Sequence, residues 1–145
     1  MTTIYFDMDG TIADLYGVEN WLDKLIASDP SPYMDAAPLL RLCTLARMLN
    51  KLQRKGNKIG IVSWLSKSGN ASYNEAVTAA KINWINRHLP SVNFDEIIIV
   101  PYGTPKASVV KDPSGILFDD EENNRVNWRG TAFDVDEIIE VLKGL

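Results

Sequence analysis

Cysteine and histidine are nearly absent, with one residue of each in the chain. A single cysteine excludes an internal disulfide, and Cys43 lies in an apolar helical stretch, so we expect it to be a small buried residue. A chain without disulfides is consistent with the cytoplasm, which is the compartment we expect. His88 follows an amphipathic segment, where a histidine is typical of a helix end at the surface. We therefore expect no histidine base.

Long apolar runs and an excess of positive charge are also absent. No stretch approaches the roughly 20 apolar residues of a membrane span. The N-terminus lacks a basic region followed by an apolar run, so we expect neither a membrane helix nor a signal peptide. Lys and Arg number 15 against 19 Asp and Glu, for a net charge of −4. This balance argues against a protein that coats a nucleic-acid backbone, while a nucleic-acid end remains open as a substrate.

The chain does contain alternating strand and helix patterns. Its 145 residues, 46% of them hydrophobic, suit one domain over residues 1–145. Apolar runs predict strands at residues 4–8, 58–64, 96–100, 116–118 and 131–133. Helical spacing predicts helices at about residues 15–27, 37–54, 73–89 and 136–142. Alternation of this kind favours an α/β fold, a three-layer, Rossmann-like parallel sheet.

An additional segment separates the first two predicted strands. One helix is enough to join two parallel strands, yet residues 15–38 add a second helix and a proline-rich loop at residues 28–32. We expect residues 15–38 to form a small lid over whatever follows the first strand. Tyr16 and Trp21 lie on this lid and are candidate substrate contacts through stacking.

Polar side chains follow the predicted strands at their carboxyl ends, where α/β sheets bind ligands. They are Asp7, Asp9, Thr11, Ser63, Lys106, Asp119 and Asp120. Four carboxylates in one cavity need a cation, and hard oxygen ligands suit Mg²⁺. An ionised carboxylate can attack phosphorus, while Lys106 and Ser63 hold the phosphoryl oxygens. Taken alone, an Asp-Gly pair is also typical of a solvated turn, and residues 119–122 of the acidic first turn of a helix.

These residues form four motifs in a fixed order. They are Asp7-Met8-Asp9-Gly10-Thr11 after a strand, Ser63 after Ile59-Gly60-Ile61-Val62, Lys106, and Asp119-Asp120 after Ile116-Leu117-Phe118. The set resembles the haloacid dehalogenase-like phosphohydrolase superfamily, and the likeness runs across the full chain. The first motif is the most specific, whereas the second and third are weak when taken alone.

The resemblance implies roles for the four aspartates. Asp7 would be the nucleophile and a metal ligand. Asp9 would be the general acid, with its backbone carbonyl oxygen on the metal. Asp120 would bind Mg²⁺ directly, and Asp119 would support it without touching the metal. An aspartate at position 9 favours phosphatase chemistry over the dehalogenase branch.

The resemblance also implies a phosphate-binding set, which comprises Ser63, Thr11 and Lys106. Lys111 competes with Lys106 for the third motif, but Lys106 follows the turn and is preferred. Asn124 stands where many relatives carry another acid, and its amide oxygen would help to hold metal-bound water.

The four tryptophans are expected mainly in the core or the lid, and Trp64 is the exception. Trp64 directly follows Ser63 and is a candidate substrate contact. The resemblance implies a Mg²⁺-dependent phosphomonoester hydrolase that acts on a small-molecule phosphate ester through an aspartyl-phosphate.

Two branches of the superfamily look similar to this chain. The run from Pro105-Lys106 to Asp119-Asp120 resembles 5′-nucleotidases that act on deoxyribonucleotides. The small lid and the strand ending at Ser63 resemble the phosphatase part of polynucleotide kinase/phosphatase proteins. The substrate thus stays open between a nucleotide and a polynucleotide 3′ end. A phosphotransferase and a non-catalytic phosphate-binding or partner-binding module remain as alternatives.

Overall fold

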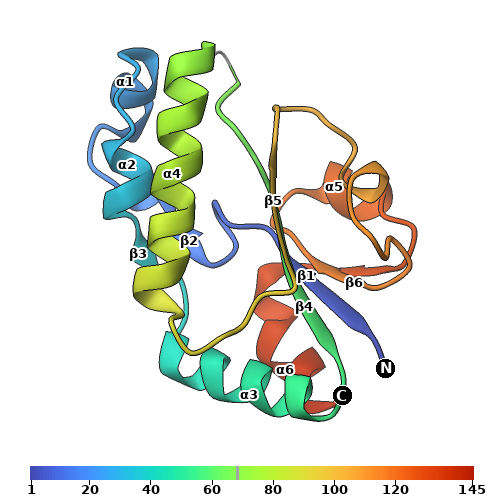
Figure 1. Ribbon diagram of the computed structural model, residues 1–145. Coiled ribbons are helices and arrows are strands. Elements are labelled where there is room, and N and C mark those ends of the chain that lie inside the picture. Colours follow the sequence, from blue (N-terminus) through green and yellow to red (C-terminus); the bar gives the residue numbers. More distant parts are fainter. Residues whose placement is uncertain (68) are drawn as a thin grey trace.

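The computed structural model describes residues 1–67 and 69–145, and its centre is a sheet of five parallel strands (Figure 1). The strands lie in the order β5-β4-β1-β6-β7, and every neighbouring pair is parallel. Their bounds are Thr3–Phe6 for β1, Lys58–Trp64 for β4, Glu96–Val100 for β5, Ile116–Phe118 for β6 and Thr131–Phe133 for β7. The prediction of an α/β fold with a Rossmann-like parallel sheet is confirmed.

The two faces of the sheet carry different covers. Because side chains alternate along a strand, Ile4 and Phe6 face one side and Tyr5 the other. Ile4 and Phe6 pack with α3 (Leu42–Arg54) and α6 (Ile138–Lys143), the latter preceded by the 3₁₀ turn η3 (Val135–Glu137). Tyr5 packs with Trp128, which follows α5 (Glu122–Val126), and with Ala107 of the 3₁₀ turn η2 (Lys106–Ser108).

Helix α4 (Ala71–His88) joins β4 to β5 and supports the lid. It begins at Asn70, whose side chain accepts the N–H of Tyr73 at 2.8 Å, an N-cap contact. Trp84 places the C-terminal half of the helix in the main core. Figure 1 shows the N-terminal half alongside the lid helices α1 and α2. Every helix in the described residues is too short or too polar to traverse a bilayer.

The segment predicted to form a lid, residues 15–38, is divided into short pieces, and we keep the name lid for it as a prediction. They are the 3₁₀ turn η1 (Leu15–Gly17), α1 (Trp21–Ile26), α2 (Ser31–Asp35) and β3 (Ala37–Pro38), which pairs with β2 (Ala13–Asp14). Leu15 and Tyr33 of the lid pack on Tyr73, Val77 and Ala80 of α4. The lid therefore packs mainly on α4, while Ala36 also joins the core cluster of the sheet.

Two predicted helix boundaries were wrong. The helix expected at residues 15–27 starts only at Trp21, because Asn20 has the left-handed φ of 58°. In addition, α2 begins at Ser31, inside the proline-rich loop expected at residues 28–32, since Pro32 is tolerated in a first helical turn. The helix expected at residues 37–54 starts at Leu42, because residues 37–38 pair as β3.

Cys43 was expected to be buried, and it is exposed. Its position in the first turn of α3 points away from the face that carries Leu45, Leu49 and Leu52. Three apolar residues at helical spacing define the buried face, and Cys43 does not fall on it.

Candidate active site

The turn after β1 brings Asp7 to the carboxyl edge of the sheet. The N–H groups of residues 11–13 all donate to the carbonyl oxygen of Met8, each at 3.0 Å, so the chain winds tightly just after Asp7. Gly10 permits the turn, because its φ of 79° is unfavourable for residues with a Cβ. A Cβ at Gly10 would also collide with the carboxylate of Asp120, so the turn packs directly against the end of β6.

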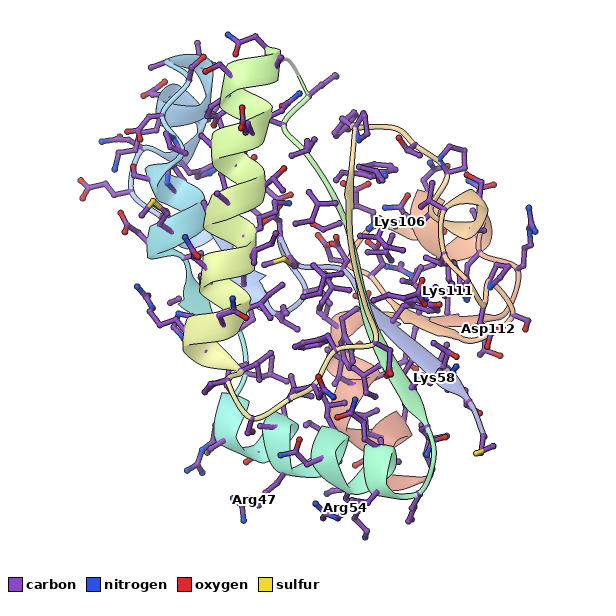
Figure 2. The ribbon with its side chains drawn as sticks, viewed as in Figure 1. Arg47, Arg54, Lys58, Lys106, Lys111 and Asp112 are labelled. Carbon is purple, nitrogen blue, oxygen red and sulfur yellow. The ribbon has the colours of Figure 1, made fainter. Side chains whose placement is uncertain are left out.

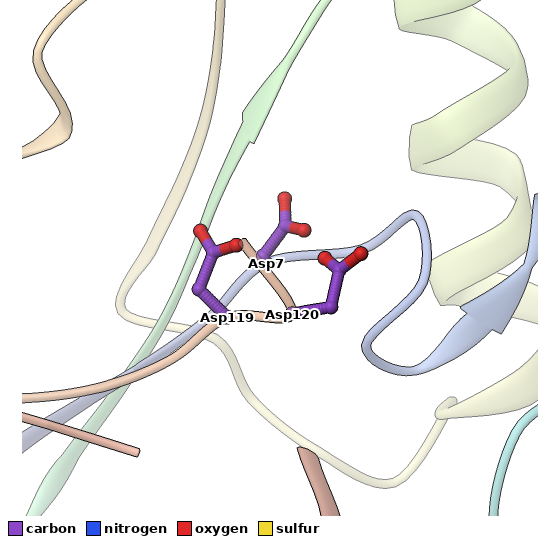
Figure 3. A group of neighbouring side chains, drawn as sticks. All are labelled: Asp7, Asp119 and Asp120. Carbon is purple, nitrogen blue, oxygen red and sulfur yellow. The ribbon is translucent and has the colours of Figure 1, made fainter. Parts of the chain in front are cut away.

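Asp7, Asp119 and Asp120 meet beyond the ends of β1 and β6 (Figure 3). One carboxylate oxygen of each lies within 4.8 Å of the other two. Burial and the neighbouring Asp7 carboxylate raise the pKa of Asp119 to about 6 and that of Asp120 to about 8. A divalent cation would relieve this repulsion, and a set made only of oxygen donors suits Mg²⁺. The three residues therefore fit the predicted metal ion.

The two aspartates after β6 differ in how many protein donors they meet. Oδ1 of Asp119 accepts a backbone N–H at 2.9 Å, and its Oδ2 accepts Lys106 at 2.6 Å and Asn124 at 3.1 Å. Asp120 instead accepts from one side-chain donor of the described residues, the hydroxyl of Thr11 at 3.3 Å, and it faces the carboxylate of Asp7. Both carboxylate oxygens of Asp119 thus accept hydrogen bonds from the protein, while those of Asp120 keep lone pairs for a metal ion. This contrast favours Asp120 as the ligand and Asp119 as its support.

Lys106 lies at the centre of the carboxylate cluster. Its Nζ donates to Oδ1 of Asp7 at 2.9 Å and to Oδ2 of Asp119 at 2.6 Å. Burial alone would lower the pKa of Lys106, but the two carboxylates outweigh it and raise the pKa above its usual range. Lys106 is therefore a fixed cation beside Asp7, in a position that suits the stabilisation of negative charge on a bound anion.

Lys111 lies away from the site. Figure 2 shows Lys106 near α5, and Lys111 farther along the sheet beside Asp112 and Lys58. The side chain of Lys111 is exposed, and its backbone N–H donates to Oε1 of Glu96 at 3.0 Å. The structure thus brings Lys106, and not Lys111, to the predicted site.

Thr11 lies between two of the carboxylates. Its hydroxyl is 3.3 Å from Oδ2 of Asp7 and 3.3 Å from Oδ1 of Asp120. This position suits a residue that orients the nucleophile and the metal ligand. The predicted contact of Thr11 with phosphate stays a prediction, as does the contact of the Asp9 carbonyl oxygen with the metal.

Lys81 is part of the site, and sequence reasoning missed it. This residue of α4 has no exposed surface, and its Nζ donates to Oδ2 of Asp9 at 2.8 Å and to Oγ of Ser63 at 2.7 Å. Burial raises the pKa of Asp9, although Lys81 opposes the shift. A signal was present in the sequence: Lys81 falls four residues after Val77 and four before Ile85, on the apolar stripe of its helix.

A cavity of about 340 Å³ opens above Asp7, Asp9 and Lys106. The predicted substrate contacts Tyr16, Trp21 and Trp64 all line it, as does Asn124, and the other lining residues are Leu15, Leu22, Leu25, Ile26, Tyr33, Leu65, Ser66, Lys67, Tyr102 and Glu121. Its walls are thus mainly apolar and aromatic, whereas its floor is charged. This division suits an anionic group held below an apolar one.

Trp64 is held at the edge of this cavity. Its Nε1 donates to the carbonyl oxygen of Thr104 at 2.8 Å, its ring lies 4.9 Å from that of Tyr102, and Nζ of Lys106 lies 5.4 Å from its centroid. Across the cavity, the rings of Tyr16 and Trp21 lie 4.9 Å apart. Trp84 and Trp128 are buried in the core, as expected.

Comparison with known proteins identifies solved structures with a similar fold. No family model matches the chain, and no curated protein matches it. Among solved structures, it is similar to the D,D-heptose 1,7-bisphosphate phosphatase from B. bronchiseptica complexed with magnesium and phosphate, with a TM-score of 0.59 and 15% identity. That match covers 91% of this chain and 78% of the phosphatase.

A second similar structure is a chain of the Pnkp1/Rnl/Hen1 complex, with a TM-score of 0.54 and 15% identity. The match covers 93% of this chain and 45% of the other, so this chain spans under half the length of that protein. Similarities at this identity establish the fold alone, a Rossmann-like α/β fold that this chain shares with both structures.

Proposed function

We propose that this protein is a Mg²⁺-dependent phosphomonoester hydrolase with Asp7 as its nucleophile. The observation that carries the proposal is the position of Asp7 at the floor of an apolar cavity, between Lys106 at 2.9 Å and the carboxylates of Asp119 and Asp120. Asp7 and Asp120 would hold the metal, together with the Asp9 carbonyl oxygen. When bound, Mg²⁺ neutralises the carboxylates and draws charge from a phosphoryl oxygen.

The reaction follows from the residues in two steps. A carboxylate oxygen of Asp7 attacks phosphorus, the bond from phosphorus to the ester oxygen breaks, and the departing oxygen takes a proton from Asp9. In the second step, Asp9 takes a proton from water, the water oxygen attacks phosphorus, and inorganic phosphate leaves with Asp7 restored. Lys106 and Ser63 stabilise the phosphoryl oxygens during both steps.

Phosphate release from a panel of esters tests this proposal. The panel contains p-nitrophenyl phosphate, 5′- and 3′-nucleotides, sugar phosphates and a 3′-phosphorylated oligonucleotide, each with Mg²⁺ or EDTA. We expect Mg²⁺-dependent release, reduced by about 10³-fold or more in Asp7→Asn, since that change removes the nucleophile. Release that is equal in the wild type and in folded Asp7→Asn would contradict the proposal and favour a non-catalytic phosphate-binding module.

The cavity walls favour an aromatic leaving group, and a nucleoside is the one we propose. Trp64, Tyr16 and Trp21 offer ring faces, which suit a flat base better than the hydroxyl-rich surface of a sugar. Trp64→Ala should then raise the KM of nucleotides by about tenfold, the loss of one stacking contact. The KM of a small alkyl phosphate serves as the internal control and should stay unchanged, and an equal rise for both esters would argue against stacking.

The 3′ end of a polynucleotide is a second candidate substrate. A further cavity of about 720 Å³ adjoins the first and shares Trp64, Tyr102, Lys106, Glu121 and Asn124 with it. A continuous depression of this kind can hold a substrate longer than one nucleotide. The similar Pnkp1 chain, a polynucleotide kinase-phosphatase, supports this candidate. Faster release from the 3′-phosphorylated oligonucleotide than from the 3′-nucleotide would select it.

Transfer to an alcohol is the alternative fate of the aspartyl-phosphate. Addition of a competing alcohol to the release assay, with a search for its phosphate ester, separates transfer from hydrolysis. We expect inorganic phosphate to remain the main product.

A further inference from the structure

Lys81 is a buried cation that the proposed reaction does not use directly. None of its surface is exposed, so it cannot touch a substrate in the cavity. A buried ammonium is costly unless its charge and its N–H groups are satisfied. The residues that contact the ammonium group therefore indicate its role, because the fold keeps this charge buried despite the energetic cost.

The three N–H groups of Lys81 meet three oxygens. Nζ lies 2.8 Å from Oδ2 of Asp9, 2.7 Å from Oγ of Ser63 and 2.6 Å from the carbonyl oxygen of Trp64. An ammonium group has three donors and no acceptor, so these contacts use all of it. Tyr33 of the lid places its ring 5.2 Å from the same nitrogen. Lys81 thus joins the turn after β1, the end of β4 and the lid.

These contacts fix the direction of two functional groups. Because Lys81 can only donate, Oγ of Ser63 must accept, and the hydroxyl hydrogen of Ser63 remains for another acceptor. Ser63 also has no exposed surface and does not line the cavity, so its contact with a phosphoryl oxygen stays a prediction. Likewise, Lys81 holds Oδ2 of Asp9, which leaves Oδ1 for the leaving group. Asp9 lines the cavity and keeps 17% of its side chain exposed, so this second oxygen has access to substrate.

We propose that Lys81 is a positioning residue, which aims the Asp9 carboxylate at the leaving group. The inference rests on the proposed function. It differs from a purely structural role, which would hold α4 against the sheet without favouring one ester over another. The two roles separate in the dependence of the rate on the leaving group.

The test compares Lys81→Met with the wild type on p-nitrophenyl phosphate and on an alkyl phosphate. Nitrophenolate departs readily without a proton, whereas an alkoxide needs one, so a misdirected Asp9 should affect the alkyl ester far more. We expect kcat/KM, which covers the steps up to departure of the leaving group, to fall by about 10²-fold or more for the alkyl ester and by less than about tenfold for the nitrophenyl ester. The value of kcat itself does not separate the two roles, because Asp9 also activates water in the second step, which both esters share.

Arg87→Met is the matched control, since Arg87 is an exposed cation on the same helix. It should leave kcat and KM unchanged for both esters. An equal loss of kcat/KM for both esters in Lys81→Met would overturn the inference and leave the proposed function standing. No Mg²⁺-dependent release by the wild type would remove both. Should circular dichroism show that Lys81→Met is unfolded, Lys81→Gln keeps an N–H donor and is judged by the same ratio of rates.

Discussion

Replacement of Lys106 by methionine removes the cation that two buried carboxylates share. The ammonium lies 2.9 Å from Asp7 and 2.6 Å from Asp119, and 3% of the lysine side chain is exposed. Loss of one partner from a buried ion pair typically costs about 3–5 kcal/mol, because the remaining charge has no compensation. Methionine fills most of the same space, so a cavity adds little. We expect Lys106→Met to lower the free energy of unfolding by about 3 kcal/mol in EDTA near pH 8.

The size of this loss depends on pH. The pKa values of Asp119 and Asp120 are raised to about 6 and about 8, so between about pH 4 and these values the metal-free folded state binds more protons than the unfolded chain. Its stability therefore falls as pH rises through that window. The deficit of Lys106→Met should grow in the same direction, because more carboxylates ionise without their counter-ion.

Urea unfolding followed by tryptophan fluorescence measures the loss, in EDTA and in Mg²⁺. Lys111→Met is the matched control, since that lysine is exposed and should change stability by less than about 0.5 kcal/mol. Mg²⁺ should recover part of the deficit of Lys106→Met, because it brings positive charge to the same carboxylates. A loss below about 1 kcal/mol in EDTA, or equal losses for the two variants, would refute the assignment of Lys106 as the counter-ion of the cluster.

Three further outcomes follow from the geometry. Mg²⁺ at about 100 times its Kd at pH 8 should stabilise the protein by about 2.7 kcal/mol, and the same Mg²⁺ concentration should raise the Tm less near pH 5, because a smaller fraction of Asp120 is ionised there; an equal rise at both pH values would contradict metal binding to this residue. Gly10→Ala, which combines an unfavourable φ with a collision against Asp120, should weaken Mg²⁺ binding at least tenfold by calorimetry. Cys43→Ser should change the urea midpoint by less than the equivalent of about 0.5 kcal/mol, since the thiol is exposed; a larger change would place Cys43 in a contact that the structure does not show.

The strands were predictable because each is a short apolar run between polar turns. The lid was not, because its helices are set by particular backbone conformations. The apolar spacing of Leu15, Val18 and Trp21 indicates a continuous helix, yet Asn20 in a left-handed conformation divides it. Arg41, which precedes α3, makes no side-chain capping bond, so no capping signal marked that boundary.

The sequence predicted which residues form the candidate site better than it predicted which of them form hydrogen bonds with one another. Motif order indicated Asp7, Lys106 and Asp119, but the hydrogen bond between Lys106 and Asp7 joins residues 99 positions apart, which only the folded chain brings together. Lys81, in contrast, was missing from the predicted list of site residues. A lysine on an apolar stripe is usually a surface residue that extends to water, and its burial depends on the acceptors offered by Asp9 and Ser63.

The way the lid is fastened determines how freely this protein can be re-engineered for new substrates. Tyr73 of α4 donates its hydroxyl to the carbonyl oxygen of Asp29 at 3.1 Å, and Trp84 of α4 donates its indole N–H to that of Ala36 at 2.8 Å. Lys81 lies between these two anchors on the same helix. A foreign recognition segment grafted between β1 and α3 would therefore leave two aromatic donors without acceptors and disturb the surroundings of Lys81. An exchange of this segment between proteins would therefore have to include the lid together with α4, because the residues proposed to contact the substrate and the residue proposed to position Asp9 lie in one connected unit.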